Sequence, residues 1–203
     1  MSDGPRDRAA HAYGRGYPDL VRGFAGDFSG APDLIARPGS AAEVAAVLDW
    51  CGAANLAAIP YGGGTSVVGG VELPLDARDR FAGVVTIDLE RLAAVEEVDA
   101  LSLSARIGAG ARGPALEAAL AAHGLTLRHY PQSFAFSTLG GWLATRAGGH
   151  FATGPTHIDD FCQALTVVTP RGVVATRRRA RPRARARARR RRCAPTTTWR
   201  RPP

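Results

Sequence analysis

The 203-residue sequence contains no lysine and only three cysteines, Cys51, Cys162 and Cys193. A Walker A loop needs its lysine to contact nucleotide phosphates, so the lack of lysine excludes that class of nucleotide site. The cysteines form no CxxC pair and have no histidine at a zinc-ligand spacing. We therefore expect neither a disulfide framework nor a bound metal, and we expect a protein of the reducing cytoplasm.

The sequence also lacks a long apolar run. Charged residues such as Asp49 and Asp88 interrupt every window of about 18 residues, which argues against a transmembrane helix. The first ten residues, MSDGPRDRAA, are charged where a secretory signal needs an apolar stretch. Because 45% of the residues are hydrophobic, the chain can nevertheless bury a globular core.

Acidic residues are absent from residues 177–203, which hold 13 of the 26 basic residues. Residues 1–176 contain 13 arginines and 18 acidic residues, a net charge of −5. This tail also lacks Leu, Ile, Val, Met, Phe and Gly, so we expect it to be disordered. One hypothesis is an arginine-rich arm that binds nucleic-acid phosphates. The other, favoured by the tail's Arg, Ala, Pro and Thr content and by the single asparagine, is out-of-frame translation of GC-rich DNA.

Hydrophobic periodicity predicts an α+β body over residues 31–176, preceded by a lead-in segment at residues 1–30. The helices and strands we expect alternate between a parallel crossover and antiparallel pairs. Strands are predicted at 34–37, 57–60, 84–88, 92–98 and 102–107, helices at 19–24, 40–54, 113–123 and 138–147, and a hairpin at 164–176. Ser40 and Glu43 have the spacing of a capping box at the start of the second helix.

A glycine-rich loop, YGGGTSVVGG at residues 61–70, directly follows a predicted strand. Three consecutive glycines let backbone N–H groups turn toward a single anion, and the next two residues add hydroxyl donors. A flexible turn is the alternative interpretation. If the loop binds a pyrophosphate, we expect a valine at Gly63 to fill the space that the ligand needs.

A second glycine pattern, Gly108, Gly110 and Gly113, matches GxGxxG between a strand and a helix. A dinucleotide site of this kind needs an acidic residue about 20 positions later to bind the ribose. No Asp or Glu occurs between Glu117 and Asp159, which favours a tight strand-to-helix turn over a nicotinamide site.

Four motifs in a fixed order carry a family resemblance: PYGGGTSV at 60–67, PQSFAFSTLGG at 131–141, ATRA at 144–147 and VVTPRG at 167–172. They resemble FAD-linked oxidases of the vanillyl-alcohol oxidase, or PCMH-type, family. Within it they look most like the branch of alkyldihydroxyacetonephosphate synthase, an ether-lipid flavoprotein. The resemblance covers about residues 11–176 and implies the N-terminal part of a PCMH-type FAD-binding domain, made of two α+β subdomains with FAD between them.

The resemblance also implies which residues bind FAD. The first motif is implied to hold the pyrophosphate, the second to lie along the flavin, and the third to complete the site. The residues so assigned are Tyr61, Gly62, Gly63, Gly64, Thr65, Ser66 and Val67, then Pro131, Gln132, Ser133, Ser137 and Thr138, then Ala144, Thr145, Arg146 and Ala147. Residues 60–70 contain no His or Cys, which favours noncovalent FAD.

We expect the five histidines, which lie outside these motifs, to occupy two kinds of location. His150 and His157 follow the flavin-lining motifs, and one of them is a candidate neighbour of the flavin ring. His11, His123 and His129 have no carboxylate or second histidine at a catalytic spacing, so we expect surface or half-buried side chains rather than ligands.

The function implied by the resemblance is that of an FAD-dependent oxidoreductase. Relatives transfer hydride from alcohols or hydroxy acids to the flavin, or exchange the acyl group of acyl-dihydroxyacetone phosphate for a fatty alcohol. Such substrates are small or lipid-like. The substrate-binding cap of the family and its catalytic residues have no counterpart in this sequence, so we expect a truncated, inactive chain. The alternative is a nonenzymatic phosphate- or nucleic-acid-binding protein that acts through the arginine-rich tail.

Deleting residues 177–203 tests the two interpretations of the tail. Because the remaining residues carry a net charge of −5, we expect the truncated protein to lose all binding to a heparin column. Its far-UV circular dichroism should keep the helix and strand signal of the full chain. Salt-dependent nucleic-acid binding by the truncated protein would contradict this expectation and support the nonenzymatic alternative.

Overall fold

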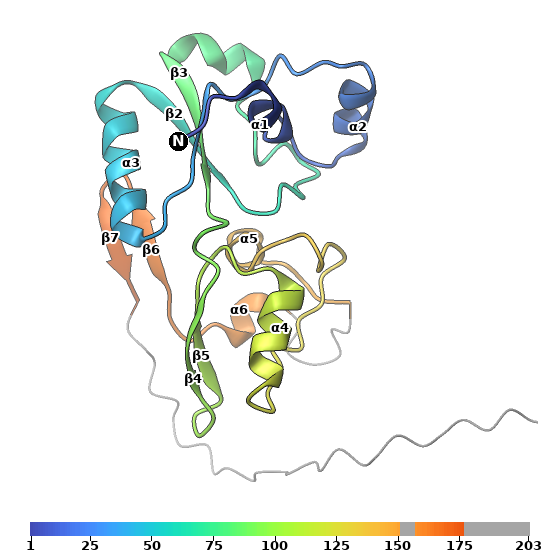
Figure 1. The fold of residues 1–203 in the computed structure, drawn as a ribbon, viewed down its shortest axis with the longest axis vertical. Helices are drawn as coiled ribbons and strands as arrows, with labels where there is room; N and C mark the ends of the chain where they lie inside the picture. Colours follow the sequence, from blue (N-terminus) through green and yellow to red (C-terminus); the bar gives the residue numbers. More distant parts are fainter. Residues whose placement is uncertain (151–156, 177–203) are drawn as a thin grey trace, which may run out of the picture.

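The computed structural model describes residues 1–150 and 157–176, which form helices and strands in two layered parts (Figure 1). The helices of this part of the chain are α1 (Pro5–Ala10), α2 (Tyr17–Phe24), α3 (Ala41–Ala53), a 3-10 helix (Leu75–Arg80), α4 (Gly113–Ala121), α5 (Leu139–Thr145) and α6 (Ile158–Phe161). The strands are β1 (Leu34–Ala36), β2 (Leu56–Tyr61), β3 (Gly83–Asp88), β4 (Val95–Asp99), β5 (Ser104–Ile107), β6 (Thr166–Thr169) and β7 (Gly172–Ala175).

The first part is built on a parallel sheet with the strand order β1-β3-β2. Its central strand, β3, is buried from Val84 to Asp88, as expected for a parallel strand covered on both faces. The crossover from β1 through α3 to β2 was predicted, but β3 lies between the two strands that it connects. Buried Cys51 of α3 packs with Ala36 and Val85 in the core of this part.

The second part has a separate core. The antiparallel pair β4–β5 and the helices α4, α5 and α6 lie together in Figure 1, below the parallel sheet. Leu116 and Leu120 of α4, Trp142 of α5 and Ile158 of α6 form the buried cluster. Two α+β units, each with its own core, confirm the fold class predicted from the sequence.

The ends of the predicted elements shift for identifiable reasons. At α3 the Ser40 hydroxyl accepts a hydrogen bond from the Glu43 N–H at 3.2 Å, as in a capping box. The Glu43 carboxylate, however, accepts from the Gly39 N–H at 2.8 Å instead of from the Ser40 N–H. Strand β4 begins at Val95 and not at residue 92, because residues 89–92 form a turn in which the Leu92 N–H donates to the Leu89 carbonyl.

Three short helices were not predicted: α1, the 3-10 helix and α6. Each has six residues or fewer, too few to show an amphipathic period. Among residues 1–150 and 157–176, none of the helices combines the length and the apolar character needed to span a membrane. The predicted disorder of residues 177–203 lies outside the described residues.

Leu116 provides a test of the second core, because its side chain is only 1% exposed. Replacing Leu116 with Ala should lower the free energy of unfolding by about 2–5 kcal/mol, since it removes buried methyl groups and leaves a cavity. The matched control is Leu101→Ala at a side chain that is 97% exposed, which should change stability by less than about 0.5 kcal/mol. Urea unfolding followed by circular dichroism measures both values, and equal effects would contradict the assigned core.

Candidate cofactor site

The glycine-rich loop leaves the parallel sheet at the carboxyl end of β2. In a parallel sheet the carboxyl ends of the strands share one edge, where ligands commonly bind. Arg37 follows β1, Gly62 follows β2, and Asp88 ends β3, so these residues meet at this edge. Gly64 has a φ of +63°, a conformation that glycine adopts without a steric penalty.

The loop packs directly against the second predicted motif. A Cβ atom at Gly62 would overlap the side-chain oxygen of Thr138, and one at Gly63 would overlap the backbone carbonyl of Phe136. Only glycine can occupy these two positions without moving the neighbouring backbone or hydroxyl group. The structure thus brings the first and second motifs into contact.

The second motif forms a compact turn in front of α5. The Ser133 carbonyl accepts hydrogen bonds from the Ser137 N–H and from the Ser137 hydroxyl, both at 2.8 Å. The same hydroxyl accepts a hydrogen bond from Nε1 of Trp142 at 2.6 Å. Thr138 caps α5 by accepting a hydrogen bond from the Gly141 N–H, whereas Gln132 is exposed. Ser137 and Thr138 are therefore buried and fixed in position.

The third motif lies at the other end of α5. Arg146 ends this helix in a left-handed conformation with a φ of +52°. Its exposed side chain pairs with Asp159, with Nε and Oδ2 2.9 Å apart. A helix of this length separates its two ends by about 10 Å, so residues 144–147 do not share the contact between Gly62 and Thr138.

The GxGxxG segment is a tight turn that supports the same site. A Cβ atom at Gly110 would overlap the Leu89 carbonyl, and one at Gly113 would overlap the Phe134 ring. Gly140 of α5 donates a hydrogen bond to the Ala109 carbonyl at 2.8 Å. The Gly110 contact joins the two parts of the fold, whereas the Gly113 and Gly140 contacts lie within the second part. Both kinds of contact agree with the structural interpretation of this motif.

The structure corrects the physical reason given for Gly63. A Cβ at this position points into the Phe136 backbone and not into ligand space. The substitution is harmful because it separates the loop from the second motif. The N–H groups of Gly63, Gly64 and Thr65 make no hydrogen bond within the part of the chain that the structure describes. These three donors are available to an anionic ligand.

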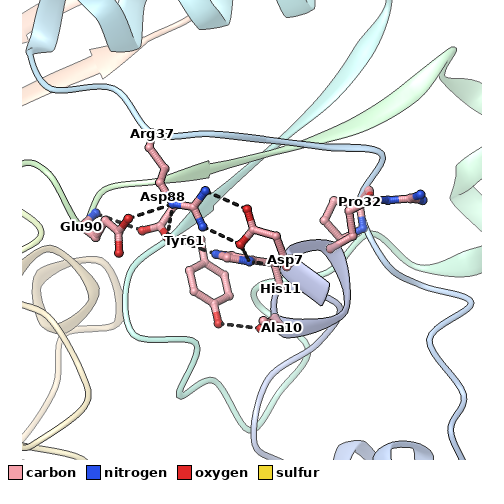
Figure 2. A network of polar contacts seen from close by, with 9 residues as sticks. Asp7, Ala10, His11, Pro32, Arg37, Tyr61, Asp88 and Glu90 are labelled. Carbon is pink, nitrogen blue, oxygen red and sulfur yellow. Dashed lines mark hydrogen bonds and ion pairs between the residues drawn. The ribbon is translucent and has the colours of Figure 1, made fainter. Parts of the chain in front are cut away.

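A charged network that the sequence analysis missed lies beside the loop (Figure 2). Nε2 of His11 is 3.1 Å from Oδ2 of Asp88, and Arg37 contacts Asp7 at 2.6 Å and Glu90 at 2.8 Å. The Arg37 guanidinium holds the pKa of the Asp7 carboxyl well below its usual range. Asp88 could have been suspected as a polar residue that ends a buried strand, but its partner is 77 positions away.

The prediction that His11 and His129 are surface or half-buried residues is wrong. Their exposed fractions are 6% and 1%, respectively. Burial lowers the pKa of His129, and its Nε2 has no hydrogen-bond partner among the described residues. His123, His150 and His157 are exposed, and the placement of His150 or His157 near a flavin remains a prediction.

Comparison with known proteins identifies the class of this domain. Residues 32–177 match the family described as FAD binding domain, and the chain belongs to this family. It is 39% identical over 180 residues to alkyldihydroxyacetonephosphate synthase of Dictyostelium discoideum, covering 89% of this chain and 29% of that protein. A solved structure of alkyldihydroxyacetonephosphate synthase superimposes with a TM-score of 0.82 at 38% identity, covering 88% of this chain and 32% of that one.

A more distant relative is D-2-hydroxyglutarate dehydrogenase of Xanthomonas citri, 33% identical over 144 residues, which cover 70% of this chain and 28% of that protein. The chain therefore spans less than a third of the length of these relatives. The matches confirm an FAD-binding domain of flavin-dependent oxidoreductases and confirm the resemblance to the synthase branch. They give no support to the nonenzymatic alternative.

The contact between the loop and the second motif predicts the effect of Gly63→Ala. Overlap with the Phe136 carbonyl should force the two segments apart, with a loss of about 1–3 kcal/mol in the free energy of unfolding and weaker FAD binding. The control is Gly52→Ala in α3, where an added Cβ meets open space. That variant should be as stable as the parent or more stable by about 1 kcal/mol. Unfolding curves and flavin fluorescence titrations measure the two effects, and an unchanged Gly63→Ala protein would contradict the packing role.

Proposed function

We propose that this chain supplies the FAD-binding part of a flavoenzyme related to alkyldihydroxyacetonephosphate synthase, an enzyme of ether-lipid synthesis. One observation carries the proposal. The glycine-rich loop lies at the carboxyl edge of a parallel sheet, is held against the Phe136–Thr138 backbone, and presents unpaired N–H groups of Gly63, Gly64 and Thr65. This arrangement suits a diphosphate bridge of the kind found in FAD.

The chain's own residues divide the binding task. The loop from Tyr61 to Val67 holds the diphosphate through backbone N–H groups and the Thr65 hydroxyl. The turn from Pro131 to Thr138 supports the loop and borders the flavin. Residues Ala144–Ala147 fix the far end of α5 through the pairing of Arg146 with Asp159. When bound, FAD supplies the redox chemistry, and the absence of His and Cys from residues 60–70 supports a noncovalent attachment.

The activity of the whole enzyme is part of the proposal. The high identity to the synthases supports a lipid-like substrate bearing a phosphate, and the dehydrogenase relative keeps a small hydroxy acid as the second candidate. We also propose a cytoplasmic location, based on the cysteine content.

We further propose that the 203-residue chain does not catalyse turnover. The hairpin β6–β7 leaves Val173 and Val174 exposed, a surface suited to further strands of a flavin domain. The family match ends at residue 177, where the arginine-rich composition begins.

An FAD titration tests the proposed function. We expect the 203-residue chain to bind FAD weakly, and we expect alcohols and hydroxy acids not to reduce the bound flavin. A chain extended by restoring one base near codon 177 should purify yellow and release its flavin into the supernatant on acid precipitation. Flavin absorbance measures both results. A colourless extended protein, or flavin that stays in the acid pellet, would contradict FAD binding or its noncovalent character, respectively.

A further inference from the structure

The N-terminal segment, defined here as residues 7–16, runs along the glycine-rich loop. The Tyr61 hydroxyl donates a hydrogen bond to the Ala10 carbonyl at 3.3 Å. Farther along, the Arg15 N–H donates to the Ser66 carbonyl at 2.6 Å, and a Cβ at Gly14 would overlap that same carbonyl. The segment thus contacts the loop at its first residue and again at its sixth.

Tyr61 connects this segment to the centre of the loop. Its ring lies against the His11 ring, with 4.4 Å between the ring centroids (Figure 2). Its hydroxyl fills the space into which a Cβ of Gly64 would project. Gly64 and Gly69 are the loop residues with a positive φ, and the position of Tyr61 constrains the first of these two sites.

The hydrogen bonds of His11 define its protonation state. Nδ1 lies 2.8 Å from the Asp7 backbone carbonyl, and Nε2 lies 3.1 Å from the Asp88 carboxylate. A backbone carbonyl and an ionised carboxylate only accept hydrogen bonds, so this geometry favours the doubly protonated imidazolium over either neutral tautomer. Because His11 is 6% exposed and Asp88 is 4% exposed, little water is present to replace either bond.

The surrounding charges favour the imidazolium. Two carboxylates face the His11 ring, Asp7 from α1 and Asp88 from β3, and Glu90 from the following loop pairs with Arg37. Arg37, after β1, is their cationic partner in the network, at 3.7 Å from Asp88. Burial by itself lowers the pKa of His11, but the hydrogen bonds to Asp88 and to the Asp7 carbonyl, together with the charges of Asp88 and Asp7, raise it above 6.5.

We propose that residues 7–16 form part of the cofactor site. In this segment the protonated His11 is a positioning residue: it holds Tyr61 in place and, through Tyr61, the glycine-rich loop. The identity of the ligand rests on the proposed function. Packing of residues 7–16 against the loop favours the protonated His11 ring. The contribution of this ring to the stability of the loop is therefore complete below about pH 6.5, and it is lost as the pH rises through the pKa of His11 in the folded protein. Loop order and FAD affinity should decline together over that range.

The direct test follows the loop without FAD. NMR of the 203-residue chain gives the pKa of His11. Amide hydrogen exchange gives the protection factors of Arg15 and Leu89, whose N–H groups donate to the Ser66 and Tyr61 carbonyls of the loop. These values, corrected for intrinsic exchange at each pH, are called loop protection below. For every unit by which the His11 pKa exceeds about 6.5, protection should fall about tenfold across the titration. Protection that stays constant while His11 titrates would overturn the proposal, and this measurement needs no variant.

Two variants separate charge from shape. His11→Gln keeps an N–H donor but carries no charge, and at pH 6 it should show the weak loop protection that the parent shows at high pH. Asp88→Asn should lower the pKa of His11 and move the loop transition to lower pH. His123→Gln, at an exposed histidine beyond α4, is the matched control and should behave as the parent. A His11→Gln protein with parental protection at pH 6 would also overturn the proposal.

FAD titrations at pH 6 and at a pH above the His11 pKa test the positioning role of His11 and the proposed FAD binding separately. Weaker FAD binding at the higher pH, together with lower protection, supports both. Loop protection that follows His11 while FAD binds at neither pH would support the positioning role and contradict the proposed function. FAD binding that is independent of pH, with unchanged protection, would support the proposed function and contradict the role of His11.

Discussion

The contact between the Gly62–Gly63 backbone and residues 136–138 is the constraint on which the site depends. It joins the parallel sheet of the first part to the turn and helix of the second, at a distance that no side chain larger than hydrogen permits. The second glycine segment makes a similar contact, through Gly110 and the Leu89 carbonyl. Backbone packing, rather than interlocking side chains, therefore sets the relative position of the two cores.

Electrostatic compensation is the second requirement of the site. Asp88 is a buried carboxylate at the edge of the sheet where the loop begins, and burial of an uncompensated charge is strongly unfavourable. His11 and Arg37 contact it, and His11 directly follows α1, which precedes the region matched by the family. The matched domain thus contains a charge whose nearest partner comes from outside its boundary.

Sequence patterns predicted most of the elements, because α3, β3 and α4 carry clear helical or strand periodicity and recognisable ends. The motif order also predicted the family. Packing against Phe136 was not predictable, since the function of Gly63 depends on a backbone carbonyl from a distant segment. The pairing of His11 with Asp88 was missed for the same reason: local spacing holds no information on residues that only the fold brings together.

The long sequence separations in this site also affect how it forms. Strand β3 pairs with both β1 and β2, so the sheet can close only after all three strands have been synthesised. The glycine-rich loop then still lacks its support until the segment around Thr138 has left the ribosome. Contacts of this range form slowly, and domains fold as their later segments emerge. The loop therefore gains its support only after the three strands of the parallel sheet have been synthesised.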